Sequence, residues 1–134
     1  MTIEKQDITQ DFYQADKKDI DFEIKDQAGV LKDLSQCEIA YALFKDDAKA
    51  PTVLIRKSSL SIDEIEVTAL GHCMVYLLPG DTFDLYGTYR HQLYVMDENG
   101  YGEIVSSGKV DIFRSFARRP RNTLTHAYLQ GTTI

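Results

Sequence analysis

The sequence predicts an all-β domain, an antiparallel β-sandwich of seven to nine short strands. Apolar and polar residues alternate with period two in several stretches, as they do in strands with one buried face. Turn-forming residues separate these stretches at intervals of roughly 8–12 residues, which is the spacing that a sandwich or barrel produces. No segment longer than one or two turns follows the helical period. The fold class follows from these three observations.

Before residue 87, strand-like runs cover residues 3–12, 20–24, 37–44, 52–57, 64–70 and 72–78. Charged or glycine-containing turns separate them. From the apolar positions of these runs and of the strand that follows, we expect nine core residues: Phe22, Ile24, Ile39, Tyr41, Val75, Leu77, Tyr89, Leu93 and Val95.

The clearest strand spans residues 87–96. Its alternate residues on one face are Tyr89, His91, Leu93 and Val95. Residues 97–100 then read Asp-Glu-Asn-Gly, and Asn and Gly tolerate the positive φ that tight turns require. A second alternating run returns with Ile104, Ser106, Val110 and Ile112 on one face. Residues 87–113 therefore predict a β-hairpin, with His91 as a hydrogen-bonded histidine of the core or of an interface.

Length and composition limit the class of protein. The chain has 134 residues, of which 43% are hydrophobic, enough for one domain with a packed core. No apolar run approaches the roughly 18–20 residues of a membrane span. The N-terminus has no apolar stretch of the kind found in secretory signals. We therefore expect synthesis in the cytoplasm and no membrane partner.

Charge divides the chain into an acidic domain, residues 1–113, and a basic C-terminal arm, residues 114–134. The domain contains 21 acidic and 11 basic residues, a net charge of −10. The arm contains four arginines and no acid, a net charge of +4. An acidic body disfavours nucleic-acid binding, whereas the arm suits an acidic surface such as the body of a neighbouring copy. We predict an assembly interface on the arm, formed by Arg114, Arg118, Arg119, Arg121, Tyr128 and Leu129.

No group of residues predicts an enzyme, a metal site or a cofactor. His72 and Cys73 are adjacent in a strand, so they point to opposite faces and do not share a metal. Cys37 and Cys73 both lie in apolar runs and are expected to be buried thiols, with a disulfide between them as the alternative. Asp81 or Thr82 is expected to be the N-cap of a single helical turn at residues 82–86. The turn that begins at Asp97 lacks the acid that a calcium loop needs at position 12, because that residue is Gly108.

One short motif resembles immunoglobulin-like domains. Asp84, Gly87 and Tyr89 are similar to the acid-glycine-tyrosine group that opens strand F there, where the tyrosine forms a corner with the upstream backbone. The spacing in this chain is one residue longer. The usual cysteine is absent, and His91 stands two residues after the tyrosine.

A longer series matches a second family in order and spacing. Its first part is Phe22, Ile24, Asp26, Gly29, Asp33, Leu34 and Ser35. It continues with Asp81, Thr82, Leu85, Gly87, Tyr89, His91, Leu93, Val95, Asp97, Gly100, Gly108, Lys109 and Val110. Through these residues the chain resembles small β-sandwich domains of tailed-bacteriophage virions, similar to the N-terminal domain of baseplate upper proteins.

The resemblance implies an Ig-like sandwich and a non-enzymatic structural role in a virion, in the tail or baseplate, the neck or a fibre attachment. It also implies that other virion proteins are partners and that the chain forms a homo-oligomer in the particle. The alternative is a β-sandwich module that binds a carbohydrate or a host receptor. The chain has eight tyrosines but no tryptophan, which makes a sugar-binding platform the second choice.

Overall fold

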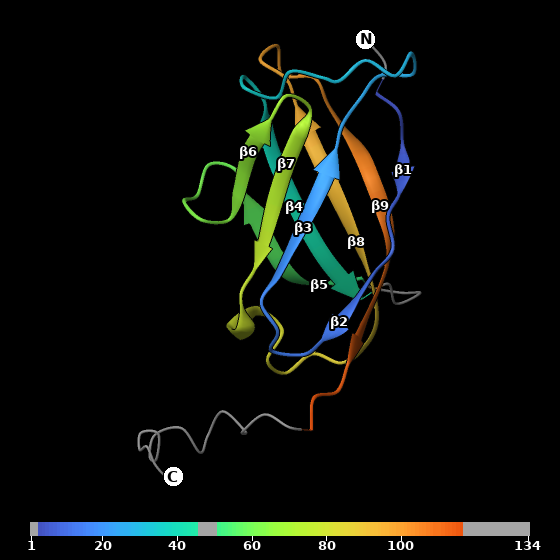
Figure 1. Ribbon diagram of the computed structural model, residues 1–134, viewed down its shortest axis with the longest axis vertical. Coiled ribbons are helices and arrows are strands. Elements are labelled where there is room, and N and C mark those ends of the chain that lie inside the picture. The colour runs from blue at the N-terminus through green and yellow to red at the C-terminus, as the bar shows by residue number, and fades with distance from the viewer. Residues whose placement is uncertain (1–2, 46–50, 117–134) are drawn as a thin grey trace.

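Two β-sheets form the part of the chain that the structure describes, residues 3–45 and 51–116 of a computed structural model (Figure 1). The sheets pack face to face, with the apolar side chains of both between them. The nine strands found in these residues confirm the prediction of an all-β sandwich.

The large sheet contains β1 (Gln6–Asp7), β2 (Gln10–Tyr13), β4 (Glu38–Lys45), β5 (Thr52–Ser58), β8 (Gly87–Met96) and β9 (Gly102–Phe113). Its order is β1-β9-β8-β4-β5, and β2 also pairs with β9. The small sheet contains β3 (Lys18–Glu23), β6 (Ile65–Ala69) and β7 (His72–Leu77), in the order β3-β7-β6. A 3-10 turn, Pro79–Asp81, follows β7.

The N-terminal segment departs from the antiparallel prediction. β1 and β2 run parallel to β9, with Gln6 opposite Ser106 and Gln10 opposite Val110, whereas the other strand pairings are antiparallel. The leading strand expected at residues 3–12 is also interrupted between β1 and β2. Along the sequence these residues show only weak alternation, so they contain no indication of which strand they join or in which direction.

All nine predicted core residues are buried, and none is more than 6% exposed. On β4 and β8 burial alternates strictly, because successive side chains of a strand point to opposite faces. The hairpin of β8 and β9 is also confirmed.

The predicted alternation on β9 is wrong at Ile104. Tyr94 lies opposite Ile104 and Leu93 lies opposite Ser106, so Val105 is an extra residue in β9, a β-bulge. Because of the bulge, Val105 and Ser106 are both buried, while Ile104 is 37% exposed on the outer face.

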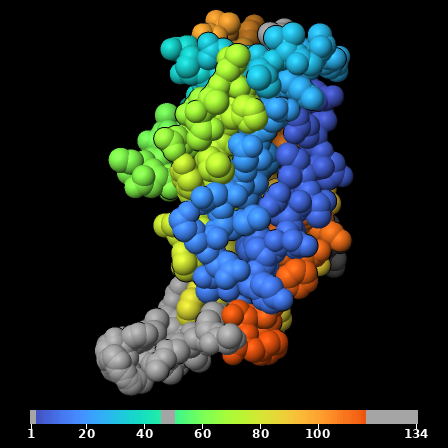
Figure 2. Space-filling model, in the orientation of Figure 1, coloured from blue at the N-terminus to red at the C-terminus, as the bar shows by residue number. Residues whose placement is uncertain are grey.

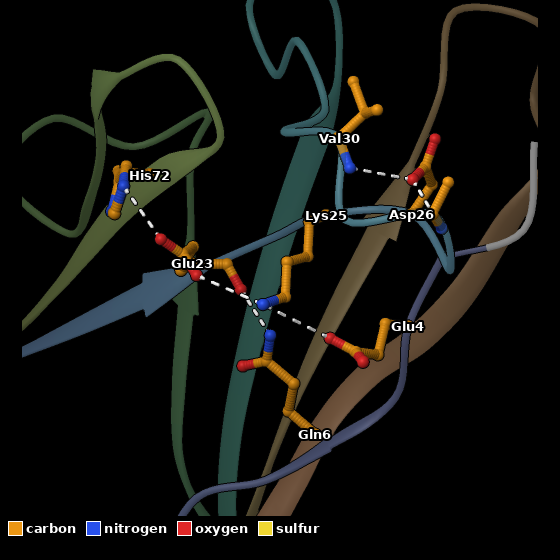
Figure 3. Close-up of polar contacts among 8 residues, drawn as sticks. Glu4, Gln6, Glu23, Lys25, Asp26, Val30 and His72 are labelled. Carbon is orange, nitrogen blue, oxygen red and sulfur yellow. Dashed lines mark hydrogen bonds and ion pairs between the residues drawn. The ribbon is translucent and has the colours of Figure 1, made fainter.

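Two turns have the same hydrogen-bond pattern: one starts at Asp97, after β8, and the other starts at Asp26, after β3. The Asp97 carboxylate accepts hydrogen bonds from the backbone N–H groups two and four residues later, at 2.9 and 3.0 Å. Asp26 accepts the same pair, both at 2.9 Å, and Figure 3 shows its bond from Val30. The third residue after each aspartate is a glycine at φ 86°. The predicted hairpin turn at residues 97–100 is thus confirmed, and its aspartate orders the turn itself.

Candidate functional site

Arg114 is the one predicted interface residue within the described residues; Arg118, Arg119, Arg121, Tyr128 and Leu129 lie outside them. The guanidinium carbon of Arg114 lies 4.0 Å from the ring centroid of Tyr86, which is a cation–π contact. The next residue, Ser115, donates its backbone N–H to the side chain of Gln14 at 3.1 Å. The start of the basic segment is therefore held against the sandwich.

Two exposed aromatic rings lie near the Arg114 guanidinium, and two more lie at the neighbouring ends of β2 and β9. Tyr13 and Phe113 lie opposite each other on β2 and β9, with ring centroids 5.6 Å apart. Arg114 lies between the rings of Tyr86 and Phe116. The exposed fractions of these four aromatic residues range from 46 to 85%. We call Tyr13, Tyr86, Phe113 and Phe116 the aromatic end, because they lie at the end of the sandwich where β9 stops (Figure 1).

The outer face of the large sheet has a hollow of about 510 Å³. Ala40 and Ala42 of β4 form its floor, and Arg56, Tyr94 and Ile104 are among its walls. The hollow exists because two small side chains stand between larger ones on neighbouring strands. Among the described residues that line it, none is a histidine or cysteine. Its floor of two alanines leaves room for an apolar side chain of a partner, while Glu38, Arg56 and Glu64 also line it.

The edge strands of both sheets are poorly suited to adding another strand. β5 and β6 each contain a bulge, at Leu54 and Thr68, which disrupts the regular backbone ladder. On the edge of β3 the Gln6 side chain donates a hydrogen bond to the Glu23 carbonyl at 2.8 Å. The edge formed by β1 and β2 is short and interrupted. Contacts with other chains are therefore expected through faces and loops.

Weak ion pairs also join the N-terminal segment to the end of β3 (Figure 3). The Lys25 amine lies 3.8 Å from carboxylate oxygens of Glu4 and of Glu23. Partly exposed pairs of this kind contribute roughly 0–1 kcal/mol each. A stronger attachment lies deeper in the fold, at His91.

His91 is buried and makes two hydrogen bonds. Its Nε2 lies 2.7 Å from the Ile8 carbonyl oxygen, and its Nδ1 lies 3.0 Å from the Tyr41 hydroxyl. A carbonyl only accepts, so Nε2 carries the proton and Nδ1 accepts from Tyr41. Burial lowers the pKa of His91, while the bond to Ile8 opposes this shift. The histidine is therefore a neutral link between β4, β8 and the N-terminal segment, which confirms its predicted place in the core.

Gly108 makes the contact between His91 and Ile8 possible. It lies opposite His91 in the β8–β9 ladder. A Cβ atom at this position would lie 2.1 Å from the Ile8 carbonyl oxygen. Because Gly108 has no side chain, the backbone of the N-terminal segment can approach the imidazole directly. A glycine inside a strand is the signal for such an approach, although the sequence does not say which backbone comes close.

Both described cysteines are free thiols. Cys73 is fully buried, and its burial raises its pKa to about 12. Cys37 is partly buried, which also raises its pKa. A raised pKa keeps a thiol protonated and unreactive. The predicted buried thiol is confirmed for Cys73 and only partly for Cys37, and the alternative of a disulfide is not observed.

His72 points away from its neighbour Cys73, as predicted. Its ring nitrogens lie 3.6 Å from a carboxylate oxygen of Asp21 and 3.5 Å from one of Glu23, on the outer face of the small sheet. Figure 3 shows the contact with Glu23. In the described ranges no group of histidine, cysteine and acidic side chains has a geometry suited to a metal ion. No helix within the same ranges is long and apolar enough to cross a membrane.

A largely buried ion pair connects the two sheets. Lys57 on β5 is 8% exposed, and its amine lies 2.8 Å from a carboxylate oxygen of Asp81, in the turn after β7. The same oxygen accepts the backbone N–H of Leu78 at 2.7 Å. Asp81 does cap a helical turn, but the predicted position is wrong: the turn spans Pro79–Asp81 rather than residues 82–86, and Asp81 is its last residue and accepts the N–H of the N-cap residue Leu78. The pairing of Asp81 with Lys57 was not predicted, because the two residues lie far apart in the sequence.

The comparisons with known proteins found no relative. No protein-family model matches the chain, and no curated protein is significantly similar to it. The proposals below therefore depend on the sequence resemblance and on the physical features of the sandwich.

Proposed function

We propose that the chain is a non-enzymatic structural protein of a tailed-bacteriophage virion, a tail or baseplate, neck or fibre-attachment component. It acts through contacts with other virion proteins and with copies of itself. The basic segment 114–134 docks on an acidic surface of the next subunit or of a neighbouring virion protein.

The observation that carries the assembly role is the placement of Arg114. This first arginine of the basic segment lies on Tyr86, within the exposed aromatic end. Aromatic residues and arginine are enriched in protein interfaces, and they contribute strongly to binding. Arginine also pairs with carboxylates in a bidentate manner, which suits an acidic partner. A basic segment that starts in an exposed aromatic cluster is therefore well placed for assembly.

The Ig-like part of the proposal has two supports. First, β3, β7 and β6 form one sheet and β4, β8 and β9 lie in the other, a division of strands that supports an immunoglobulin-like sandwich. Second, the Tyr89 hydroxyl donates a hydrogen bond to the Tyr86 carbonyl at 3.0 Å, at the start of β8. A tyrosine corner makes this contact with the backbone a few residues upstream.

The core offers a further parallel. In antibody domains a tryptophan packs on the disulfide that joins the sheets. Here Phe22, Tyr41 and His91 occupy β3, β4 and β8, and their ring centroids are 5.5–6.2 Å apart. We interpret this aromatic group as the replacement for the disulfide and tryptophan, in a chain whose described cysteines are free.

The experiment compares two variants for incorporation into particles. One replaces Arg118, Arg119 and Arg121 by Glu; the other replaces Lys17, Lys18 and Lys109 of the sandwich by Glu as a charge-matched control. In a phage that encodes the chain, we expect the arginine variant to be lost from purified particles and the control to be retained. If the wild-type chain is itself absent from purified particles, the virion role is wrong. Normal incorporation of the arginine variant would reject the role of the arm.

A carbohydrate- or receptor-binding module is the second candidate, and the aromatic end favours it, because exposed tyrosine rings can stack on sugars. Its test is a glycan array probed with the wild-type chain and with a Tyr13→Ala, Tyr86→Ala double variant. Specific binding that the double variant loses would favour this candidate over the assembly role.

A further inference from the structure

The loop between β5 and β6 projects from the side of the sandwich (left in Figures 1 and 2) and carries two strongly exposed apolar residues. Leu60 is 76% exposed and Ile62 is 89% exposed. Scattered apolar residues are ordinary on protein surfaces, but two on the tip of one projecting loop are not explained by packing within the chain. We call residues 60–63 the knob.

The base of the knob is held by hydrogen bonds. The Ser58 hydroxyl accepts the backbone N–H of Leu60 at 3.1 Å, and a carboxylate oxygen of Glu64 accepts the backbone N–H of Ser58 at 2.9 Å. Ser61 donates its N–H to the Ser58 carbonyl at 3.2 Å. A fixed backbone presents Leu60 and Ile62 with little loss of conformational entropy on binding.

The knob stands directly beside the hollow on the outer face of the large sheet. Ser58 and Glu64, which hold the base of the knob, also line that hollow. The floor of the hollow, Ala40 and Ala42, has room for apolar side chains. A projection and a hollow side by side on one surface form a self-complementary patch, in which each of two copies inserts its knob into the hollow of the other.

One pair of opposite charges lies on the two parts of the patch, although the acids Glu38 and Glu64 also line the hollow. Arg56 is exposed on the wall of the hollow, and Asp63 is exposed on the knob. Neither residue forms an ion pair with another residue in the part of the chain that the structure describes. When the knob of one copy enters the hollow of another, Asp63 approaches the partner's wall, where Arg56 is available for a bidentate contact.

We propose that the partner of this surface is a second copy of the chain, bound about a twofold axis by reciprocal insertion of Leu60 and Ile62 into the hollow over Ala40 and Ala42. This inference deepens the proposed function, because it names one self-contact of the assembly and separates it from the contact of the basic segment. The bulges of β5 and β6 favour this arrangement over pairing of edge strands.

The first experiment is sedimentation equilibrium of the purified full chain. We expect a dimer whose dissociation constant rises at least about tenfold in a Leu60→Asp, Ile62→Asp variant. Val30→Asp is the matched control, because Val30 is 57% exposed on a different loop, and it should dimerise as the wild type does. Ala42→Arg, which fills the hollow, should also abolish the dimer. Dimerisation that survives in both the knob and the hollow variants would overturn the proposal.

The second experiment tests the charge pair with a double-mutant cycle of Arg56→Gln and Asp63→Asn. Asp63 has a φ of 65°, which asparagine also tolerates, so the loop should keep its shape. If the two residues pair across the interface, the double variant dimerises about as weakly as either single variant. Strictly additive effects would contradict the pairing.

The outcomes separate this inference from the virion role. Dissociation constants near about 1 mM already belong to very weak complexes. If the wild-type chain stays monomeric up to about 1 mM, the proposal that a second copy is the partner is wrong. If that monomeric chain is still found in particles, only the present inference fails. Should the chain dimerise as described but be absent from particles, the virion role fails and the self-contact stands.

Discussion

The Tyr41 hydroxyl donates a hydrogen bond to Nδ1 of His91 at 3.0 Å, between two neighbouring strands in the middle of the core. Through its other nitrogen His91 donates to the Ile8 carbonyl. One buried imidazole therefore orients a tyrosine of β4 and holds the segment between β1 and β2. The bond from Tyr41 requires the neutral ring with a free Nδ1, whereas the bond to Ile8 requires only the proton on Nε2.

The neutral state of His91 makes stability dependent on pH. Its pKa in the folded protein is lowered by burial from the ordinary value of 6.5. Because the unfolded chain then binds more protons, the stabilisation is complete above pH 6.5 and declines as pH falls toward the folded pKa. We expect the free energy of unfolding in urea to fall between about pH 7 and about pH 5.5.

His91→Phe is the matched variant for this measurement. It removes the titrating group while it keeps a ring of similar size, and part of the pH slope should disappear with it. Arg90 and Asp7, which lie near His91 and act on its pKa in opposite directions, remain in both proteins. An identical slope in wild type and variant would show that His91 does not titrate as described.

Gly108→Ala should destabilise the attachment of the N-terminal segment. The new Cβ would meet the Ile8 carbonyl at 2.1 Å, so the backbone of one of the two segments must move. Forced overpacking of this kind costs roughly 1–3 kcal/mol. Hydrogen exchange should report faster exchange of the Ile8 amide, which donates to the Ser107 carbonyl. Ser107→Ala is the control, and equal protection in both variants would contradict the close approach.

Leu93→Ala should be strongly destabilising. Leu93 is completely buried between the sheets, so its truncation loses transfer free energy and leaves a cavity, at a cost of roughly 2–5 kcal/mol. Val30→Ala is the control, because a residue that is 57% exposed and lies outside the proposed dimer surface should change stability by no more than about 0.5 kcal/mol. Urea denaturation measures both, and similar effects of the two variants would refute the assigned burial.

The pair Lys57–Asp81 should respond unequally to the removal of its two partners. Asp81→Asn keeps an acceptor for the Leu78 N–H but leaves the largely buried Lys57 amine without its counter-charge. We expect a loss of roughly 1–3 kcal/mol, less than for a fully buried pair because Asp81 is partly exposed. Lys57→Met, which fills the same space without a charge, should cost less. Thermal unfolding of both variants measures the difference. If the Lys57→Met variant is less stable than the Asp81→Asn variant, the expected order is wrong.

The sequence by itself determined the elements that depend on local patterns. Strict alternation identified β4 and β8 and placed Tyr41, His91 and Leu93 inside, because a strand exposes every second residue to the same environment. The turn after Asp97 was predictable for a similar reason, since its hydrogen bonds join residues only a few positions apart. Such features need no knowledge of the rest of the fold.

Only the tertiary structure decided the features that depend on distant segments. The parallel pairing of β1 and β2 with β9, the contact of Ile8 with His91 past Gly108, and the Lys57–Asp81 pair join residues more than 20 positions apart. The bulge that exposes Ile104 depends on the register with β8, which no local period encodes. The polar residues around Leu60 and Ile62 predict a turn, but only the tertiary structure shows that this loop projects away from both sheets and leaves the two side chains exposed.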